Sequence, residues 1–266
     1  MAKELKVLVV GALGKMGRET VRAVKMSDAL VLAGAVDVKA SNERISDITG
    51  DENDRDAIWP DLDEALDSLK LDVVVDFTNP QAVFNNARSV LRQGLPGVIG
   101  TTGLNEREIQ ELDQLARDNQ TGIAIVPNFA IGAVLMMRFA EESSRYFADV
   151  EIVELHHEGK LDAPSGTAIK TAEMIERNRQ GIPLAPRGQF EKYPGARGGQ
   201  VNGVRVHSIR LPGLVAHQEV IFGGQGQTLS IRHDSYNRES FMPGVILTIQ
   251  KIVNTTGLVY GLEHLI

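Results

Sequence analysis

The segment 154–167 holds the densest group of reactive side chains in the sequence, including His156, His157 and Lys160. A histidine near its ordinary pKa of about 6.5 can release a proton at neutral pH, and a nearby lysine cation assists that release. The Ser-Gly-Thr run at 165–167 has the residue types of a helix start, where free N–H groups attract a carboxylate. We expect this segment to form an anion-binding pocket with a proton donor.

Two other interpretations of this segment stay open. The histidines can lie on a solvent-exposed loop without a chemical role. Alternatively, four side chains can bind a metal ion: His156, His157, Glu158 and Asp162. The two histidines are adjacent, so they lack the His-x-x-x-His spacing that places two imidazoles on one face of a helix. We therefore favour the anion-binding pocket and expect no metal site.

A second candidate site is the glycine turn at residues 11–17, Gly-Ala-Leu-Gly-Lys-Met-Gly. Against the dinucleotide template G-x-G-x-x-G, Gly14 and Gly17 match, whereas Ala12 occupies the first glycine position. Such a turn between a strand and a helix lets backbone N–H groups approach a pyrophosphate. A tight turn without a ligand is the alternative. No Gly-Lys-Ser/Thr follows, which excludes a nucleoside-triphosphatase phosphate loop.

Asp37 is placed to select the cofactor, because it ends the second expected strand, where an acid can bind the adenosine ribose. Lys15, Arg18 and Lys39 are close enough in sequence to meet a 2′-phosphate. The acid favours NADH and the cations favour NADPH. The sequence therefore predicts a nicotinamide dinucleotide, NADH or NADPH, without deciding between them.

The first half of the chain must supply the elements that position this turn. Short β-branched runs alternate with helical patterns, which predicts an α/β, Rossmann-like, doubly wound parallel sheet. We expect strands at 5–10, 30–37, 73–78, 98–100 and 123–126, and helices at 15–26 and 105–119, the latter opening with an Asn105/Glu108 capping box. Residues 39–72 read as loop with one short helix. Loops 100–103 and 127–129 follow strands and are expected to line the nicotinamide half of the site.

The second half has the pattern of an α+β domain with an antiparallel or mixed sheet. We expect helices at 132–147 and 167–179, a strand at 150–156, a loop at 181–203, strands at 204–211, 215–222 and 228–233, and a last helix at 240–253. The predicted domains are a dinucleotide-binding domain, 1–127, completed by 240–266, and a substrate-binding and oligomerisation domain, 128–239.

Composition narrows the class of protein. The 266 residues carry a net charge of −7, which disfavours nucleic acid as a partner. There is no cysteine, so disulfides, thiolate metal sites and cysteine nucleophiles are excluded. No apolar run approaches the roughly 20 residues that a membrane span needs. We expect a soluble cytoplasmic enzyme that does not bind membranes.

Taken together, the motifs resemble one family, the dihydrodipicolinate reductases of the diaminopimelate route to lysine. The resemblance rests on the glycine turn, on Val-Asp-Phe-Thr at 75–78, on Gly-Thr-Thr-Gly at 100–103, on Asn-Phe at 128–129 and above all on the segment 156–167. It covers nearly the whole chain in the same order. It implies a Rossmann-like domain, a substrate domain and a homotetramer.

The resemblance also implies roles for individual residues. Those toward the cofactor are Gly11, Ala12, Leu13, Gly14, Lys15, Met16, Asp37, Gly100, Thr101, Thr102, Val126, Pro127, Asn128 and Phe129. Those toward a dicarboxylate substrate are His157, Gly166 and Thr167, with His156 as the acid/base residue and Lys160 as a proton donor. Two positions depart from the family pattern. Asn79 stands where some relatives have a basic residue, and His217 receives no role.

The function predicted on this basis is the NADH- or NADPH-dependent reduction of a cyclic, unsaturated dicarboxylate. Hydride comes from the nicotinamide, and the developing negative charge is quenched by a proton from His156, supported by Lys160. One alternative is another Rossmann-type dehydrogenase of an amino-acid pathway, which leaves the histidine-lysine segment unexplained. The other is a nicotinamide-sensing binding protein. Arg238 is either a substrate clamp, a hinge residue or an ordinary surface arginine.

Overall fold

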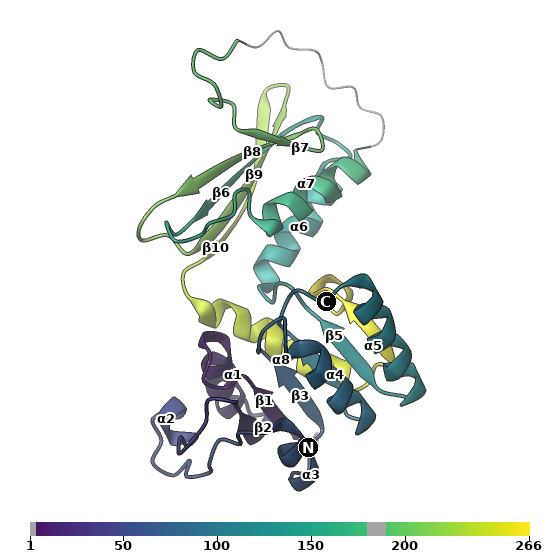
Figure 1. Ribbon diagram of the computed structural model, residues 1–266. Coiled ribbons are helices and arrows are strands. Elements are labelled where there is room, and N and C mark those ends of the chain that lie inside the picture. The colour runs from purple at the N-terminus through teal and green to yellow at the C-terminus, as the bar shows by residue number, and fades with distance from the viewer. Residues whose placement is uncertain (1–3, 180–189) are drawn as a thin grey trace. The chain divides into compact units, whose positions relative to one another are not determined.

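The computed structural model describes residues 4–179 and 190–266 (Figure 1). The chain divides into two compact units. The first combines Met1–Ile131 with Phe241–Ile266, and the second is Gly132–Ser240. The first unit is therefore built from two stretches of sequence, one before and one after the residues of the second unit.

The first unit contains a six-stranded parallel sheet with the order β11-β5-β4-β3-β1-β2. Its strands are β1 (Leu5–Val10), β2 (Leu30–Val36), β3 (Val73–Asp76), β4 (Gly97–Ile99), β5 (Gly122–Ile125) and β11 (Gly257–Tyr260). The chain runs from β1 to β2 on one side and then to β3 on the other, so the strand order reverses beside β1. This arrangement confirms the predicted Rossmann-like, doubly wound sheet.

Helices flank this sheet. They are α1 (Lys15–Lys25), α2 (Ser46–Thr49), α3 (Leu62–Ser68), α4 (Val83–Arg92), α5 (Glu106–Asp118) and α8 (Met242–Ile252), with the short 3₁₀ turn η2 (Leu262–His264). A second 3₁₀ turn, η1 (Arg238–Phe241), spans the boundary at which the chain returns from the second unit to the first. The predicted Asn105/Glu108 capping box opens α5, as expected. The prediction of one short helix in 39–72 was wrong, because both α2 and α3 form there. Asp61 caps α3 by accepting from the Glu64 N–H at 3.0 Å.

The C-terminal segment completes the first unit. Helix α8 approaches the backbone after β5 so closely that a Cβ on Gly244 would lie 1.9 Å from the Phe129 carbonyl oxygen. Strand β11, which the sequence did not reveal, then pairs with β5, and its Leu258 N–H donates to Oδ1 of Asp113 at 2.8 Å. Residues far apart in the sequence thus share one sheet.

The second unit is built on a five-stranded mixed sheet with the order β10-β9-β6-β8-β7. Its elements are α6 (Ile131–Ser143), β6 (Asp149–His156), α7 (Gly166–Asn178), β7 (Gly199–Val201), β8 (Val204–Arg210), β9 (Ala216–Gly224) and β10 (Gln227–Ser235). Strand β6 pairs in parallel with β8 and antiparallel with β9, which confirms the mixed sheet. Of the predicted loop 181–203, residues 181–189 lie outside the described residues, and the prediction was wrong at β7.

Side chains alternate across this sheet. On β6, Val150, Ile152 and Glu154 are buried, and the residues between them are half-buried. Helix α7 packs against β6, β7 and β8 (Figure 1). Within the residues that the structure describes, no helix is long and apolar enough to cross a membrane.

Candidate active site

The glycine turn leaves no room for side chains at two of its positions. Gly11 has a φ of +79°, and a Cβ on it would lie 2.7 Å from the Phe77 carbonyl oxygen. A Cβ on Gly17 would lie 2.0 Å from the carbonyl oxygen of Gly11. Glycine at these positions lets α1 start directly beside the end of β1.

The backbone N–H groups of the turn divide into two sets. Those of residues 11–14 donate to acceptors within the unit: Gly11 and Ala12 to the Val36 carbonyl, Leu13 to Asp37, and Gly14 to the Gly11 carbonyl. Those of residues 15–17 have no acceptor within the described parts of the chain, and no side chain caps this helix start. The first turn of α1 therefore offers N–H groups and a positive dipole end to an anion.

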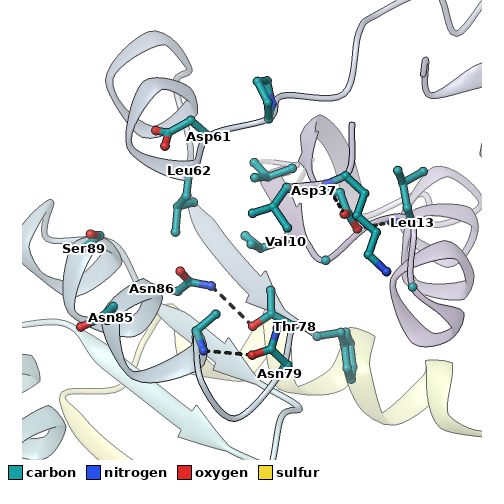
Figure 2. A pocket seen from close by; sticks show the side chains of 18 of the residues that line it. Val10, Leu13, Asp37, Asp61, Leu62, Thr78, Asn79, Asn85, Asn86 and Ser89 are labelled. Atoms are coloured by element: carbon teal, nitrogen blue, oxygen red, sulfur yellow. Dashed lines mark hydrogen bonds between the residues drawn. The ribbon is translucent and has the colours of Figure 1, made fainter. Parts of the chain in front are cut away.

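A cavity of about 470 Å³ opens beside this turn (Figure 2). It is lined by the ends of β1 and β2, by the segment directly after β3, by the start of α3 and by α4, so it lies where the strand order reverses. Of the predicted cofactor residues, Gly11, Leu13, Gly14 and Asp37 line it. Ala12, Lys15 and Met16 do not. Lys39 carries the only positive charge among the described lining residues.

Asp37 is fixed within this cavity. Its side chain is buried, with Oδ2 accepting from the Leu13 N–H at 2.9 Å and Oδ1 from the Lys39 N–H at 3.0 Å. A carboxylate oxygen has more than one lone pair, so both oxygens can still accept from a ribose hydroxyl. Asp37 thus has a structural role in the turn as well as a place in the cavity.

The loops after β4 and β5 gather around Phe77. A Cβ on Gly100 would lie 2.0 Å from the Phe77 ring, and the rings of Phe77 and Phe129 lie 5.6 Å apart between centroids. Thr101 is buried, whereas Thr102 and Pro127 are exposed. None of the predicted residues at 100–102 or 126–129 lines the 470 Å³ cavity. These loops form a separate group at the same sheet edge.

Asp76, at the end of β3, organises the loop that leads from β3 to α4. It is buried and accepts from the Thr78 N–H and hydroxyl at 2.8 and 2.6 Å and from the Asn86 amide at 2.7 Å. Burial raises the pKa of Asp76, and these hydrogen bonds oppose the increase. Sequence reasoning used Asp76 only as part of a motif. An acid as the last residue of a buried strand was the signal for its role.

In the second unit, His156 ends strand β6 and contacts a buried acid. Its Nδ1 lies 2.5 Å from Oε2 of Glu154, whose side chain is fully buried. Burial lowers the pKa of His156, the Glu154 carboxylate opposes this shift, and the charges of Lys160 and Arg210 add to it. The predicted acid/base residue therefore lies in a defined electrostatic environment.

Glu154 and Arg210 are the functional candidates that sequence reasoning missed. Arg210 donates to both carboxylate oxygens of Glu154, at 2.9 and 2.8 Å, and the Ser165 N–H donates to one at 3.3 Å. Burial alone would raise the pKa of Glu154, but hydrogen bonds from Arg210, Ser208 and His156 outweigh it and hold the pKa below its ordinary value. Glu154 is consequently ionised at neutral pH.

The loop after β6 brings the other predicted residues to this end of the sheet. Lys160 Nζ lies 2.7 and 2.8 Å from the two carboxylate oxygens of Asp162, and the His157 side chain is exposed. Gly166 and Thr167 form the first turn of α7, which Ser165 caps by accepting from the Ala168 N–H at 3.2 Å. The loop and helix start thus provide cations and N–H groups that suit an anionic ligand.

The remaining candidates lie elsewhere. His217 is buried and bonded at both ring nitrogens, to Asp234 at 2.7 Å and to the Val215 N–H at 3.2 Å. Arg238 lies in η1 and is exposed. Among the described residues, no group of three or more His, Asp or Glu side chains is arranged to hold a metal ion.

Comparison with known proteins decides the family. The family model described as dihydrodipicolinate reductase, N-terminus, matches residues 5–129, and the one described as its C-terminus matches residues 132–266. The chain belongs to the dihydrodipicolinate reductase family. A reductase named 4-hydroxy-tetrahydrodipicolinate reductase from Syntrophomonas wolfei subsp. wolfei is 58% identical over 266 residues, 100% of each chain. One of the same name from Bacillus cereus is 47% identical over 264 residues, 99% of each.

Solved structures agree with this membership. The dipicolinate-bound dihydrodipicolinate reductase from Paenisporosarcina sp. TG-14 superimposes with a TM-score of 0.87 at 41% identity, covering 99% of this chain and 100% of that one. An amine dehydrogenase from Mycobacterium smegmatis has a TM-score of 0.68 at 11% identity, covering 97% and 95%, and shares the fold alone. Reductases of this family thus match the chain over both of its units.

Proposed function

We propose that this chain is the oxidoreductase that reduces 4-hydroxy-tetrahydrodipicolinate in the diaminopimelate route to lysine. The observation that carries the proposal is the meeting of His156, Lys160 and the start of α7 at one end of the second sheet, on a chain whose relatives carry this name. A dicarboxylate requires such cations and N–H groups, and a reduction requires a proton source beside them.

The first unit fits a nicotinamide dinucleotide. The two crowded glycines and the free N–H groups at 15–17 make a turn into which a pyrophosphate fits, and Asp37 is placed for the ribose. The first turn of α1, from Lys15, would contribute those N–H groups. The loops at 100–102 and 126–129 are proposed to face the nicotinamide half. When bound, the reduced nicotinamide supplies the hydride.

The protein's own residues supply the proton and the anion site. We propose that His157 and the backbone at Gly166 and Thr167 bind the substrate carboxylates. His156 gives a proton to the negative charge that develops on the ring, and the Lys160 ammonium supports that transfer. The pKa of His156 is lowered by burial in the free protein, and the two negative charges of a bound dicarboxylate raise it again.

NADH is the proposed cofactor in preference to NADPH. Asp37 is fixed in the cavity by two backbone N–H groups, and Asp61 and Asp63 line the same cavity. These carboxylates repel a 2′-phosphate, and Lys39 alone among the described lining residues attracts one. A Lys39→Ala variant is expected to lose affinity for NADPH and to keep its affinity for NADH.

We propose a homotetramer that works in the cytoplasm. The face of the second sheet that carries the half-buried Val153, Leu155 and Ile221 suits self-association, since apolar side chains on an open sheet face gain by being covered. The cysteine-free sequence is compatible with a reducing compartment.

The test is a coupled assay with purified protein and the freshly formed product of dihydrodipicolinate synthase, run with NADH and NADPH side by side. Oxidation of the nicotinamide that depends on this product is expected, faster with NADH. Cofactor binding without turnover would favour a nicotinamide-sensing protein. Turnover only with other amino-acid-pathway substrates would favour a different dehydrogenase.

A further inference from the structure

We propose that Glu154, clamped by Arg210, is the positioning residue of His156: it fixes a proton on Nδ1 and thereby makes Nε2 the atom that exchanges a proton with the substrate. This inference rests on the proposed role of His156 as the acid. It assigns functions to two residues for which neither the motifs nor the composition suggested one.

The first argument is the contact itself. His156 Nδ1 lies 2.5 Å from Oε2 of Glu154, and among the described residues Nε2 has no hydrogen-bond partner. An ionised carboxylate can only accept hydrogen bonds, so Nδ1 must be the donor. The neutral ring then carries its proton on Nδ1 and its lone pair on Nε2. This leaves a single ring nitrogen for the chemistry.

The second argument is that Glu154 is held ionised and in one orientation. Its side chain is fully buried, and a buried carboxylate is costly unless it is paired. Arg210 pairs with both oxygens, in the bidentate geometry that fixes a carboxylate plane. Arg210 also donates to the Asp162 carbonyl at 2.7 Å, which ties the loop that carries Lys160 to the same clamp.

The third argument concerns proton affinity. The charged groups around His156 are Glu154 on its own strand, Arg210 on β8, and Lys160 on the following loop, where Asp162 pairs with it. The Ser165 N–H, directly before α7, adds a hydrogen bond to Glu154. Of these groups, Glu154 is the negative charge in direct contact with the ring, so it favours the protonated imidazolium. Without Glu154, the ring would hold the second proton more weakly.

The first experiment compares Glu154→Gln with Glu158→Gln. Both variants lose one negative charge, but Glu158 is exposed, whereas Glu154 is fully buried and contacts His156 Nδ1. Glu154→Gln is expected to lower kcat about 10- to 100-fold, with KM little changed. This loss is smaller than most of the roughly 10²- to 10⁴-fold that general acid–base catalysis contributes, because His156 itself remains. Its pH profile should shift toward acid, because His156 loses its proton at lower pH. Glu158→Gln should match the unaltered protein, and full turnover in Glu154→Gln would overturn the proposal.

The second experiment does not depend on turnover, and its readout is made on the unaltered protein. Two-bond ¹H–¹⁵N NMR of protein labelled at histidine reports which ring nitrogen is protonated, and His156→Gln identifies the His156 signals. The unaltered protein should show neutral His156 protonated at Nδ1. A ring protonated at Nε2, or an even mixture, would overturn the proposal. If the protein reduced no dihydrodipicolinate but showed the Nδ1 tautomer, the proposed function would fail and the positioning by Glu154 would stand.

Discussion

The Cα atom of Gly17 lies so close to the carbonyl oxygen of Gly11 that a Cβ on Gly17 would stand 2.0 Å from that oxygen. This contact joins the first turn of α1 to the end of β1, and it sets the position of the N–H groups proposed to bind a pyrophosphate. Replacing Gly17 therefore tests whether binding of the dinucleotide depends on this close backbone contact.

Gly17→Ala is expected to lower the free energy of unfolding by about 1–3 kcal/mol, since the added methyl group must displace backbone. It should also abolish the fluorescence change that reports NADH binding. Gly97→Ala is the control, because a Cβ there would meet its nearest atom at 3.5 Å, an ordinary contact. Normal NADH affinity in Gly17→Ala would show that the turn adapts.

Lys160→Gln is expected to raise the pKa of His156. The Lys160 charge lowers this pKa, so removing it raises the pKa. Removing Lys160 also leaves the negative charge of Asp162 unpaired by this lysine, and that charge raises the pKa further. The imidazolium should therefore persist to higher pH in the variant. Histidine signals followed by NMR across the acid-to-neutral pH range check this, with the exposed Lys251→Gln as control. An unchanged or lower pKa would contradict the electrostatic account.

Asp113→Ala is expected to loosen β11 from the rest of the first unit. It removes the acceptor for the Leu258 N–H and the ion pair with Arg117, and hydrogen bonds to charged groups contribute about 1.5–3 kcal/mol at most. Asp113→Asn keeps an acceptor oxygen and should lose less. Chemical denaturation measures both variants, and equal losses would show that the Leu258 contact contributes nothing.

The same carboxyl gives a pH dependence of stability. Burial raises the pKa of Asp113, but the hydrogen bonds from Arg117 and Leu258 outweigh it, so the folded-state pKa is lower than the unfolded value of about 3.9. Its contribution is therefore complete above that value and is lost as the pH falls through the folded-state pKa. The stability difference between the unaltered protein and Asp113→Ala should narrow in acid.

Ile221→Lys is expected to disrupt self-association. Ile221 faces Glu151 across β6 and β9, so a lysine there has a partner within its own chain but introduces a charge on the open sheet face. Light scattering after size-exclusion chromatography should show a smaller assembly than the unaltered protein. Gln110→Lys, on an exposed position of α5, adds the same charge and should leave the mass unchanged. An intact tetramer in Ile221→Lys would place the interface elsewhere.

The parts of the fold that the sequence predicted are those with local signals. Buried strands such as β1 and β6 read as β-branched runs, and α5 was predicted from its capping box. Strand β11 has only four residues, and its extended conformation depends on pairing with β5. A pairing between segments so far apart in the sequence leaves no local pattern. Helix α4 was missed although Val83, Ala87 and Val90 have helical spacing.

The candidate site shows the same division. His156 and Lys160 could be found because they lie in one short segment. Glu154 and Arg210 lie 56 residues apart and meet only through the register of β6 and β8, where His156 pairs with Arg210 and Glu154 with Ser208. The sequence offered one usable signal, the Glu-x-His alternation that places both side chains on one face of a strand.

The return of the chain to its first sheet has a consequence for biosynthesis. As a ribosome makes the protein, β5 emerges early, but its outer edge stays unpaired until residues 257–260 have been made. The second unit is continuous in sequence and can fold during that interval. Unpaired strand edges invite association with other chains, so we expect the nascent first unit to be the part of this protein that is most prone to aggregate before synthesis is complete.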